Sequence, residues 1–381
     1  MKRPALYSLV LLGAAVFMIP FLWTVSTALK TRQQSFGSPS EWVPRTYRMP
    51  RDDGPAVAVN VAQRIDQPAA VVRIGAGPRR GQLLGVPLSD LIQEDGHLLL
   101  RLRGAEPVPV SIEREMPGGL LQVRFVDPDT RRQTERFVSP NQVQSIFDPQ
   151  IDNFAKAWNS YEHGGALPLP FYVFVLNTYT ITILNIIGQT LSCSLVAYGF
   201  ARFRFRGRKG LFLLLLSTMM LPPQVTMIPV YLIWNTAGLV NTFGPLTIPA
   251  YFAQNAFFVF LLRQFFLGIP RELDEAAMID GCGPLRIWWQ IVLPLSKPAI
   301  TTVAVLSFIG HWDDFLGPLI YLNDLHNYTV SIALRLFQDQ YGSDFNLLMA
   351  AALIHIVPVL VLFFLAQRYF VKGIAMTGLK A

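Results

Sequence analysis

The most unusual side chains in this sequence are two adjacent aspartates inside an apolar run. Asp313 and Asp314 follow His311 and Trp312, and the residues on both sides are mostly hydrophobic. If that run crosses a membrane, ionisable groups at its depth are costly and indicate a function. The two carboxylates could then line a translocation path and offer hydrogen bonds to the hydroxyl groups of a solute. The alternatives are that they lie near the outer interface or hold neighbouring helices together.

A second concentration of polar groups lies in residues 269–298, IPRELDEAAMIDGCGPLRIWWQIVLPLSKP. This stretch is too polar to span a membrane, but it is well suited to two short helices. Pro270 fits the first position of a helix, and Gly281 can end that helix in a left-handed conformation. Gly283-Pro284 can begin the second helix. The helix dipole favours negative charge in the first turns, which here hold Glu272, Asp274 and Glu275.

The first of these helices has a face of small and acidic residues. Spacing of three, four and seven residues places four side chains on one side of it: Leu273, Ala276, Ala277 and Asp280. Small side chains let another surface approach closely, and acidic groups at the edge can pair with basic partners. We therefore predict a docking surface for another protein, the alternative being a capped surface helix between two membrane spans.

Motifs for catalysis and for nucleotide binding are absent from the sequence. No Gly-x-x-x-x-Gly-Lys-Ser/Thr phosphate loop occurs, so the chain is not expected to bind ATP by itself. No Gly-x-Ser-x-Gly elbow is present. Residues 31–169 contain only two histidines and no Cys-x-x-Cys, which leaves a metal site there unsupported. We expect no catalytic residue, no metal and no cofactor bound by this chain.

Composition indicates an integral membrane protein. Of 381 residues, 52% are hydrophobic and 15% are charged, whereas soluble chains carry about 25% charged residues. Six apolar runs reach the length of about 20 residues that a helix needs to cross a bilayer. They are residues 7–28, 171–200, 211–234, 246–266, 299–322 and 347–370. The first run exceeds the length of a secretory signal and is expected to stay as an uncleaved anchor.

The basic residues predict the orientation of the chain. Residues 31–169 contain equal numbers of basic and acidic residues, so the net charge of +7 belongs to the membrane part. Most basic residues there lie before the first run, after the second, after the fourth and after the sixth. The positive-inside rule then places both termini in the cytoplasm and residues 31–169 outside. This pattern is not that of a nucleic-acid binder.

The outer segment is predicted to be rich in β-structure. Short β-prone runs recur between turn signals such as Pro117-Gly118-Gly119. The spacing suggests a small antiparallel barrel or sandwich inserted at about 50–146. We expect an all-α polytopic membrane protein of six transmembrane helices, with this small β-rich extracytoplasmic domain between the first and second. The expected divisions are 1–30 for the first helix, 31–169 for the extracytoplasmic segment and 170–381 for the remaining five helices.

Two prolines and an asparagine are further candidates in the spans. Pro222 and Pro223 must kink or break the third run, either as part of gating or as a static packing feature. Asn255 lies within the fourth run and is a weak candidate for the translocation path. His355, within the sixth run, is more often a packed polar group than a ligand.

The loop at 269–298 resembles a known signature. Glu275-Ala276-Ala277, three residues, Gly281, nine residues and Ile291-x-Leu293-Pro294 agree with the EAA motif of ABC-importer permeases at all of its fixed positions. In that family the motif forms a coupling helix, which docks into a groove of the cytoplasmic ATPase subunit. The resemblance assigns ATPase coupling to six residues here: Leu273, Glu275, Ala276, Ala277, Asp280 and Gly281.

Flanking segments resemble the carbohydrate branch, the MalG-like permeases. They include LSTMMLPPQVTMIPVYLI, GLVNTFGPLTIPAYF, FIGHWDDFLGPLIYL and the ending QRYFVKGIAMTGLKA. In that branch Asp313 is often Asn, which is a mild departure. The β-rich insertion is the main departure, because members usually have a short loop there. We hypothesise that it contacts a binding protein or a sister permease.

The resemblance implies the fold of a type I ABC importer permease and a set of partners. They are a second, MalF-like permease, two ATPase subunits carrying ATP and Mg²⁺, an extracytoplasmic binding protein and a carbohydrate substrate. The chain would be a non-catalytic, multi-pass subunit in the cytoplasmic (inner) membrane. Three alternatives stay open: an importer of another solute such as a glycerol phosphate, an ion-coupled secondary transporter, and a membrane-anchored extracytoplasmic sensor.

Overall fold

The computed structural model describes residues 3–35, 42–51, 54–76, 78–94, 97–101, 107–126, 132–159, 169–339 and 344–377. The last four residues of the C-terminal segment QRYFVKGIAMTGLKA and one of the two histidines of 31–169, His163, lie outside these ranges. The chain forms two compact units. The first contains Met1–Phe154 with Asp344–Ala350, and the second contains Ala155–Ser343 with Ala351–Ala381.

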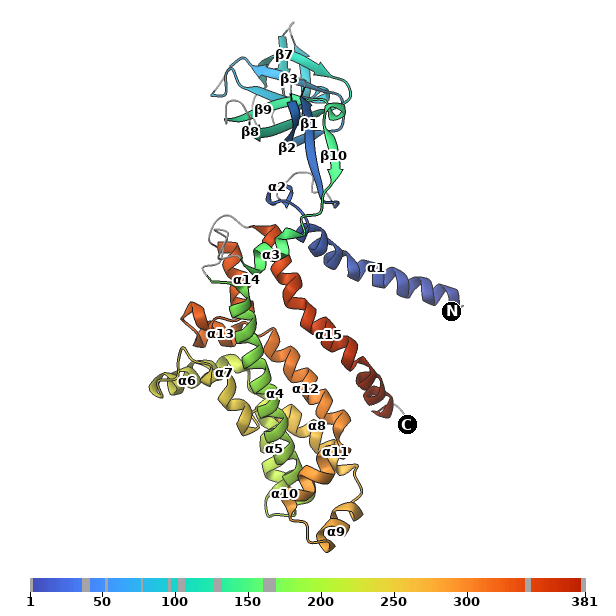
Figure 1. The fold of residues 1–381 in the computed structure, drawn as a ribbon, viewed down its shortest axis with the longest axis vertical. Helices are drawn as coiled ribbons and strands as arrows, with labels where there is room; N and C mark the ends of the chain where they lie inside the picture. The colour runs from blue at the N-terminus through green and yellow to red at the C-terminus, as the bar shows by residue number, and fades with distance from the viewer. Residues whose placement is uncertain are drawn as a thin grey trace. The chain divides into compact units, whose positions relative to one another are not determined.

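The strands of the first unit form two antiparallel five-stranded sheets (Figure 1). One has the order β10-β1-β2-β8-β9 and the other the order β4-β3-β7-β6-β5. In the sequence, the five strands of the second sheet lie between β2 and β8, which pair with each other in the first sheet. The strands are β1 (Arg45–Arg51), β2 (Gly54–Ile65), β3 (Ala69–Ile74), β4 (Leu83–Pro87), β5 (Leu91–Glu94), β6 (His97–Leu100), β7 (Val108–Met116), β8 (Leu120–Val126), β9 (Gln133–Val138) and β10 (Gln144–Phe147). The prediction of a β-rich region is confirmed.

Each sheet curls around an apolar core of its own. A single 3₁₀ turn joins the two edge strands of each sheet: η1 (Leu88–Asp90) between β4 and β5, and η2 (Pro140–Gln142) between β9 and β10. Alternate residues of each strand point to one side. In the first sheet this places Val59, Val123 and Phe125 in one buried cluster. In the second sheet it places Val72 and Val110 in a separate buried cluster.

A third apolar cluster joins the two sheets. It contains Ala69, Val71, Met116 and Leu120, with Phe137 packed against it. Strand β4 comes so close to β8 that a Cβ atom on Gly85 would lie 2.6 Å from Cδ2 of Leu120. The absence of a side chain at Gly85 is therefore what lets the two sheets meet.

Helices account for most of the remaining described residues. They are α1 (Arg3–Ala28), α2 (Arg32–Ser35), α3 (Asp152–Trp158), α4 (Phe171–Arg202), α5 (Arg208–Ser217), α6 (Pro223–Thr236), α7 (Gly244–Thr247), α8 (Ala256–Leu267), α9 (Glu272–Ile279), α10 (Pro284–Ile287), α11 (Leu293–Leu295), α12 (Lys297–Trp312), α13 (Leu316–Tyr321), α14 (Val330–Asp339) and α15 (Phe345–Thr377). Four short turns complete the path: η3 (Thr218–Met220), η4 (Ile248–Phe252), the π-helical turn η5 (Trp288–Val292) and η6 (Leu325–Asn327).

Within the described residues, four helical segments are long and apolar enough to cross a membrane, or up to six if two bent pairs each count as one span. The four are Tyr7–Ala28, Phe171–Arg202, Gly244–Leu267 and Phe345–Gln367. The third predicted span is not one straight helix, because Arg208–Met220 and Pro223–Thr236 meet at 99°. The backbone breaks at Leu221 and Pro222, where a proline cannot continue a helix.

The fifth predicted span, 299–322, is also not one helix. Helix α12 ends at Trp312, and α13 begins at Leu316. The break occurs at the aspartates, where the side chain of Asp314 accepts a hydrogen bond from the backbone N–H of Gly317 at 3.1 Å. A carboxylate in that position starts a new helix rather than continuing the old one. At the other end, α12 meets the segment Pro284–Leu295 at 83°.

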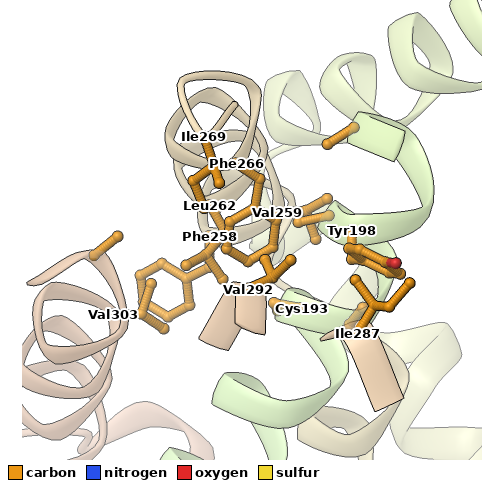
Figure 2. Close-up of a cluster of buried hydrophobic side chains, with 14 of the residues drawn as sticks. Cys193, Tyr198, Phe258, Val259, Leu262, Phe266, Ile269, Ile287, Val292 and Val303 are labelled. Atoms are coloured by element: carbon orange, nitrogen blue, oxygen red, sulfur yellow. The ribbon is translucent and has the colours of Figure 1, made fainter. Parts of the chain in front are cut away.

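The second unit is organised around α4, which packs against α8 and α12 (Figure 1). Their contact forms an apolar cluster that includes Cys193 and Tyr198 from α4, and Phe258 and Leu262 from α8 (Figure 2). Polar side chains join neighbouring segments where the spans are not purely apolar. Asn185 of α4, for example, donates to the carbonyl of Leu246 at 2.8 Å.

One loop contact gives a test of this packing. Asn241 has a positive φ of 65°, and its side-chain oxygen accepts from the backbone N–H groups of Asn323 (2.9 Å) and Asp324 (2.8 Å). We expect Asn241→Ala to lower the free energy of unfolding by about 2 kcal/mol, because it removes both bonds and disfavours the left-handed backbone. Thermal unfolding in detergent measures this. Asn241→Gly keeps the backbone conformation accessible and should lose less; equal stability of wild type and Asn241→Ala would contradict the prediction.

Candidate functional site

The segment between α8 and α12 folds as the sequence predicts, as short helices. Helix α9 starts after Arg271, with the acidic residues in its first turn. It ends where Gly281 takes a φ of +79° and Cys282 donates its backbone N–H to the carbonyl of Ala277 at 2.9 Å. Glycine adopts this left-handed conformation without strain. Proline at the first position of α10 then restarts the helix.

Helix α9 is fixed to the end of α4 by an ion pair. The Nε atom of Arg202 lies 2.9 Å from Oδ2 of Asp274, and the two side chains are 5% and 11% exposed. A second nitrogen of Arg202 donates to the carbonyl of Ile269 at 3.1 Å. Burial raises the pKa of Asp274, although Arg202 and Arg271 act in the opposite direction. The positive charge of Arg202 thus offsets part of the cost of burying this carboxylate.

Ala277 faces the interior together with Asp274. It is buried and belongs to the same apolar cluster as Phe266 and Ile287. The prediction that Ala277 shares an outward face with Leu273, Ala276 and Asp280 is therefore wrong. Positions three apart lie on one side of a helix, and the ion pair of Asp274 turns that side inward, carrying Ala277 with it.

The outward side of this segment is a mixed polar and apolar surface. The charged side chains of Glu272, Glu275 and Asp280 are exposed there. Large apolar side chains also remain uncovered, namely Leu273, Met278, Ile279, Leu285 and Trp289, and Ile279 is 86% exposed. An apolar surface with a polar rim marks a site of protein or membrane interaction. We refer to these eight residues as the α9–α10 surface.

Asp313 and Asp314 have different surroundings, although they are adjacent. Asp313 lies just past the end of α12, and its Oδ1 is 3.1 Å from Nε2 of His355 on α15. The backbone carbonyl of His355 accepts from the indole N–H of Trp312 at 3.0 Å, and the two rings stack. Asp314 instead caps the start of α13. Of the two, only the side chain of Asp313 is largely exposed, at 57%.

The other candidates lie in structural positions. The side chain of Asn255 accepts from the backbone N–H of Phe258 at 3.2 Å, which caps the start of α8. Pro222 lies at the bend between α5 and α6, and Pro223 is the first residue of α6. Each of these three residues lies at the start of a helix, and none belongs to the α9–α10 surface.

Sequence reasoning missed Arg202 and the function of Asp274. Arg202 counted only as one of several basic residues of the loop after the second span. The sequence does not show that Arg202 is paired and largely covered while Arg204 and Arg206 are exposed, because its partner Asp274 is 72 positions away. The pair of His355 with Asp313 was missed for the same reason.

These features define a class of protein, a helical membrane protein with several candidate spans. Residues 191–376 match the family described as binding-protein-dependent transport system inner membrane component. The β-strands lie outside that match. Among solved structures, a bacterial ABC transporter involved in the import of the acidic polysaccharide alginate shares the fold. It has a TM-score of 0.50 at 24% identity, covering 58% of this chain and 80% of that chain.

Two curated relatives are permease proteins of named transport systems. The arabinooligosaccharides transport system permease protein AraQ of Halalkalibacterium halodurans is 35% identical over 243 residues, which cover 63% of this chain and 84% of AraQ. The sn-glycerol-3-phosphate transport system permease protein UgpE of Rhizobium meliloti is 38% identical over 205 residues, covering 53% and 72%. This chain belongs to the family of inner membrane components of binding-protein-dependent transport systems, the permeases of ABC importers. The resemblance inferred from the sequence is confirmed.

Proposed function

We propose that this chain is one of two transmembrane subunits of an ATP-driven importer of a carbohydrate, an oligosaccharide or a related solute. The observation that carries the proposal is the α9–α10 surface, which is rigidly tied to α4 by Arg202 and Asp274. The AraQ relative supports an oligosaccharide as substrate. The UgpE relative keeps a glycerol phosphate as the second candidate.

In the proposed mechanism this chain forms half of the translocation path and carries the coupling helix α9. ATP hydrolysis takes place on partner subunits that bind ATP and Mg²⁺. An ATPase subunit receives α9 in a groove, with Glu275, Ala276 and Ile279 in the contact. Movement of that subunit shifts α9, and the ion pair transmits the shift to α4, the central helix of the second unit. The bend at Pro222 and Pro223 then gives the third span a place to flex.

The orientation and the other partners form part of the same proposal. Arg202 joins the end of α4 to α9, so the loop after the second span and the loop after the fourth lie on one side of the membrane. The exposed basic residues Arg204, Arg206 and Lys209 place that side in the cytoplasm. Both termini are then cytoplasmic, six spans cross the membrane, and Asp313 lies toward the outside. A MalF-like permease and an extracytoplasmic binding protein complete the complex.

The test is affinity purification of the tagged chain from native membranes in mild detergent, with mass spectrometry of the retained proteins. We expect an ATPase with a phosphate-loop motif in about two copies, a second permease and a binding protein. Thermal shift of the retained binding protein with sugars and with glycerol 3-phosphate then separates the two substrate candidates. Recovery of the chain alone, under conditions that preserve other ABC complexes, would contradict the proposal.

Asp313 distinguishes this proposal from an ion-coupled secondary transporter. Asparagine keeps an acceptor oxygen for His355, and the Asp313 side chain is largely exposed, so loss of its charge should cost about 0–1 kcal/mol. We therefore expect Asp313→Asn to retain ATP-dependent uptake within about five-fold of wild type. Uptake of radiolabelled solute into proteoliposomes, with and without ATP, measures this. A secondary transporter that used this carboxylate would lose coupling in the variant and would not need ATP.

A further inference from the structure

The β-rich unit has an exposed apolar surface where the chain leaves α1 and where it returns toward α3. Five large apolar side chains are exposed there: Trp42, Val43, Ile146, Phe147 and Ile151. Phe147 and Ile151 are 66% and 67% exposed. In the rest of the described residues between 42 and 154, only Leu83 and Ile112 are also large, apolar and exposed. Uncovered apolar surface is therefore concentrated in these five residues, which we call the root of the β-rich unit.

Hydrogen bonds fix the root to the last turn of α1. The hydroxyl of Ser26 donates to the carbonyl of Trp42, and the backbone N–H of Gln150 donates to the carbonyl of Leu29 at 2.8 Å. The buried amide of Asn153 donates to two more carbonyls at that end, at 2.7 and 2.8 Å. Strand β1 therefore begins, and strand β10 ends, beside the last turn of α1 (Figure 1).

Helix α1 sets the depth of the root. Its apolar run Tyr7–Ala28 has 22 residues, so it is about 33 Å long, slightly more than the hydrocarbon core of about 30 Å. The end of the run then lies in the interfacial layer. There the rings of Trp23 and Trp42 are 4.9 Å apart, and Nζ of Lys30 is 4.2 Å from the ring centre of Trp23. Tryptophan and lysine are typical anchors at the interface between hydrocarbon and water.

The root is exposed on more than one side, which favours lipid over a protein partner. Neighbouring residues of a strand point to opposite sides, so Ile146 and Phe147 at the end of β10 face different directions, and both are uncovered. A docked protein covers one side of such a strand, whereas the interfacial layer of a membrane surrounds it. Arg45 pairs with Phe147 across the two strands and is exposed as well. Its guanidinium group can bind a lipid phosphate.

We infer that the root of the β-rich unit is immersed in the interfacial layer on the extracytoplasmic side of the membrane, with phospholipid as its partner. The inference rests on the proposed function in one respect, namely that α1 crosses the membrane. Apolar side chains that enter this layer bind a protein segment to the membrane surface. The insertion thus gains a lipid contact of its own, where the sequence left open only a contact with a binding protein or a sister permease.

The test measures the depth of single labelled positions in the full transporter complex in lipid nanodiscs. Cys282→Ser removes the partly exposed thiol, and Cys193 is fully buried. Phe147→Cys or Ile151→Cys then introduces the cysteine that is labelled with the fluorophore NBD. Leu83→Cys is the matched control, because Leu83 is an exposed apolar residue of the same unit outside the root. The nanodiscs contain phosphatidylcholine with a spin label on the headgroup, with a spin label in the middle of the acyl chain, or without a label.

We expect the headgroup spin label to quench the fluorescence at positions 147 and 151 by about half and to leave that at position 83 nearly unchanged. If positions 147 and 151 are quenched no more than position 83, the root lies in water and the inference is wrong. A blue-shifted emission at position 147 without quenching would also overturn it, since a protein subunit would then cover the root.

Val16→Cys, on the same Cys282→Ser background, separates this inference from the proposed function. Val16 is exposed and lies near the middle of the apolar run of α1, so the acyl-chain spin label should quench a fluorophore there. Quenching at position 16 without quenching at position 147 would retain α1 as a span and refute the immersion of the root. Absence of quenching at position 16 would refute the span, and the inference with it. ATP-driven uptake by the same complexes reports separately on the proposed transport function.

Discussion

Arg202→Met is expected to abolish uptake and to destabilise the segment that carries α9. The substitution leaves the carboxylate of Asp274 buried without its partner, and breaking a buried pair from one side costs about 3–5 kcal/mol. It also removes the bond to the carbonyl of Ile269. The variant should unfold at a lower temperature, and ATP-dependent uptake should fall more than about ten-fold.

A double variant tests whether the ion pair is the cause. Arg202→Met with Asp274→Leu removes both charges, and replacing a buried pair by apolar side chains is often neutral. Stability should therefore recover most of the way toward wild type. Arg204→Met is the matched control, because Arg204 lies in the same loop and is exposed; surface changes of this kind stay within about 0.5 kcal/mol. If Arg202→Met matches wild type in both measurements, α9 is not held by this pair.

Ala277→Pro is the second substitution from which we expect a large effect. Proline inside α9 removes a backbone hydrogen bond and clashes with the carbonyl of Leu273, at a cost of about 3 kcal/mol or more. Because Ala277 also packs into the apolar cluster around α4 and α8, the helix would be displaced from the unit. Uptake should be lost, and stimulation of ATPase activity by the binding protein should be lost with it.

The control for this variant is Ala277→Gly. Glycine keeps the N–H and adds no atoms, so the cost is the difference in helix propensity, about 1 kcal/mol. Uptake should persist at a reduced level. A membrane-anchored sensor would retain its function in both variants, since its activity would reside in the β-rich unit. Normal uptake by Ala277→Pro would refute the assignment of α9 as the coupling helix.

Sequence alone determined the features that depend on local composition and spacing. Hydropathy located the six apolar runs, since burial in lipid requires about 20 consecutive apolar residues. The fixed register from Glu275 to Pro294 identified the family, which the comparisons confirm. Gly281 and Pro284 marked helix boundaries because their backbone restrictions act within a few residues, whereas α9 begins at Glu272, two residues after the predicted Pro270.

The tertiary structure decided which faces of these helices are covered. A period of 3.6 residues groups side chains, but it does not say which group meets the core. Asp274 and Ala277 turn inward because Arg202 approaches from a helix far away in the sequence. The pairing of Asp313 with His355 and the close approach of the two sheets at Gly85 and Leu120 likewise arise from segments that meet only after folding. Contacts of this kind depend on the path of the whole chain, and no local pattern encodes them.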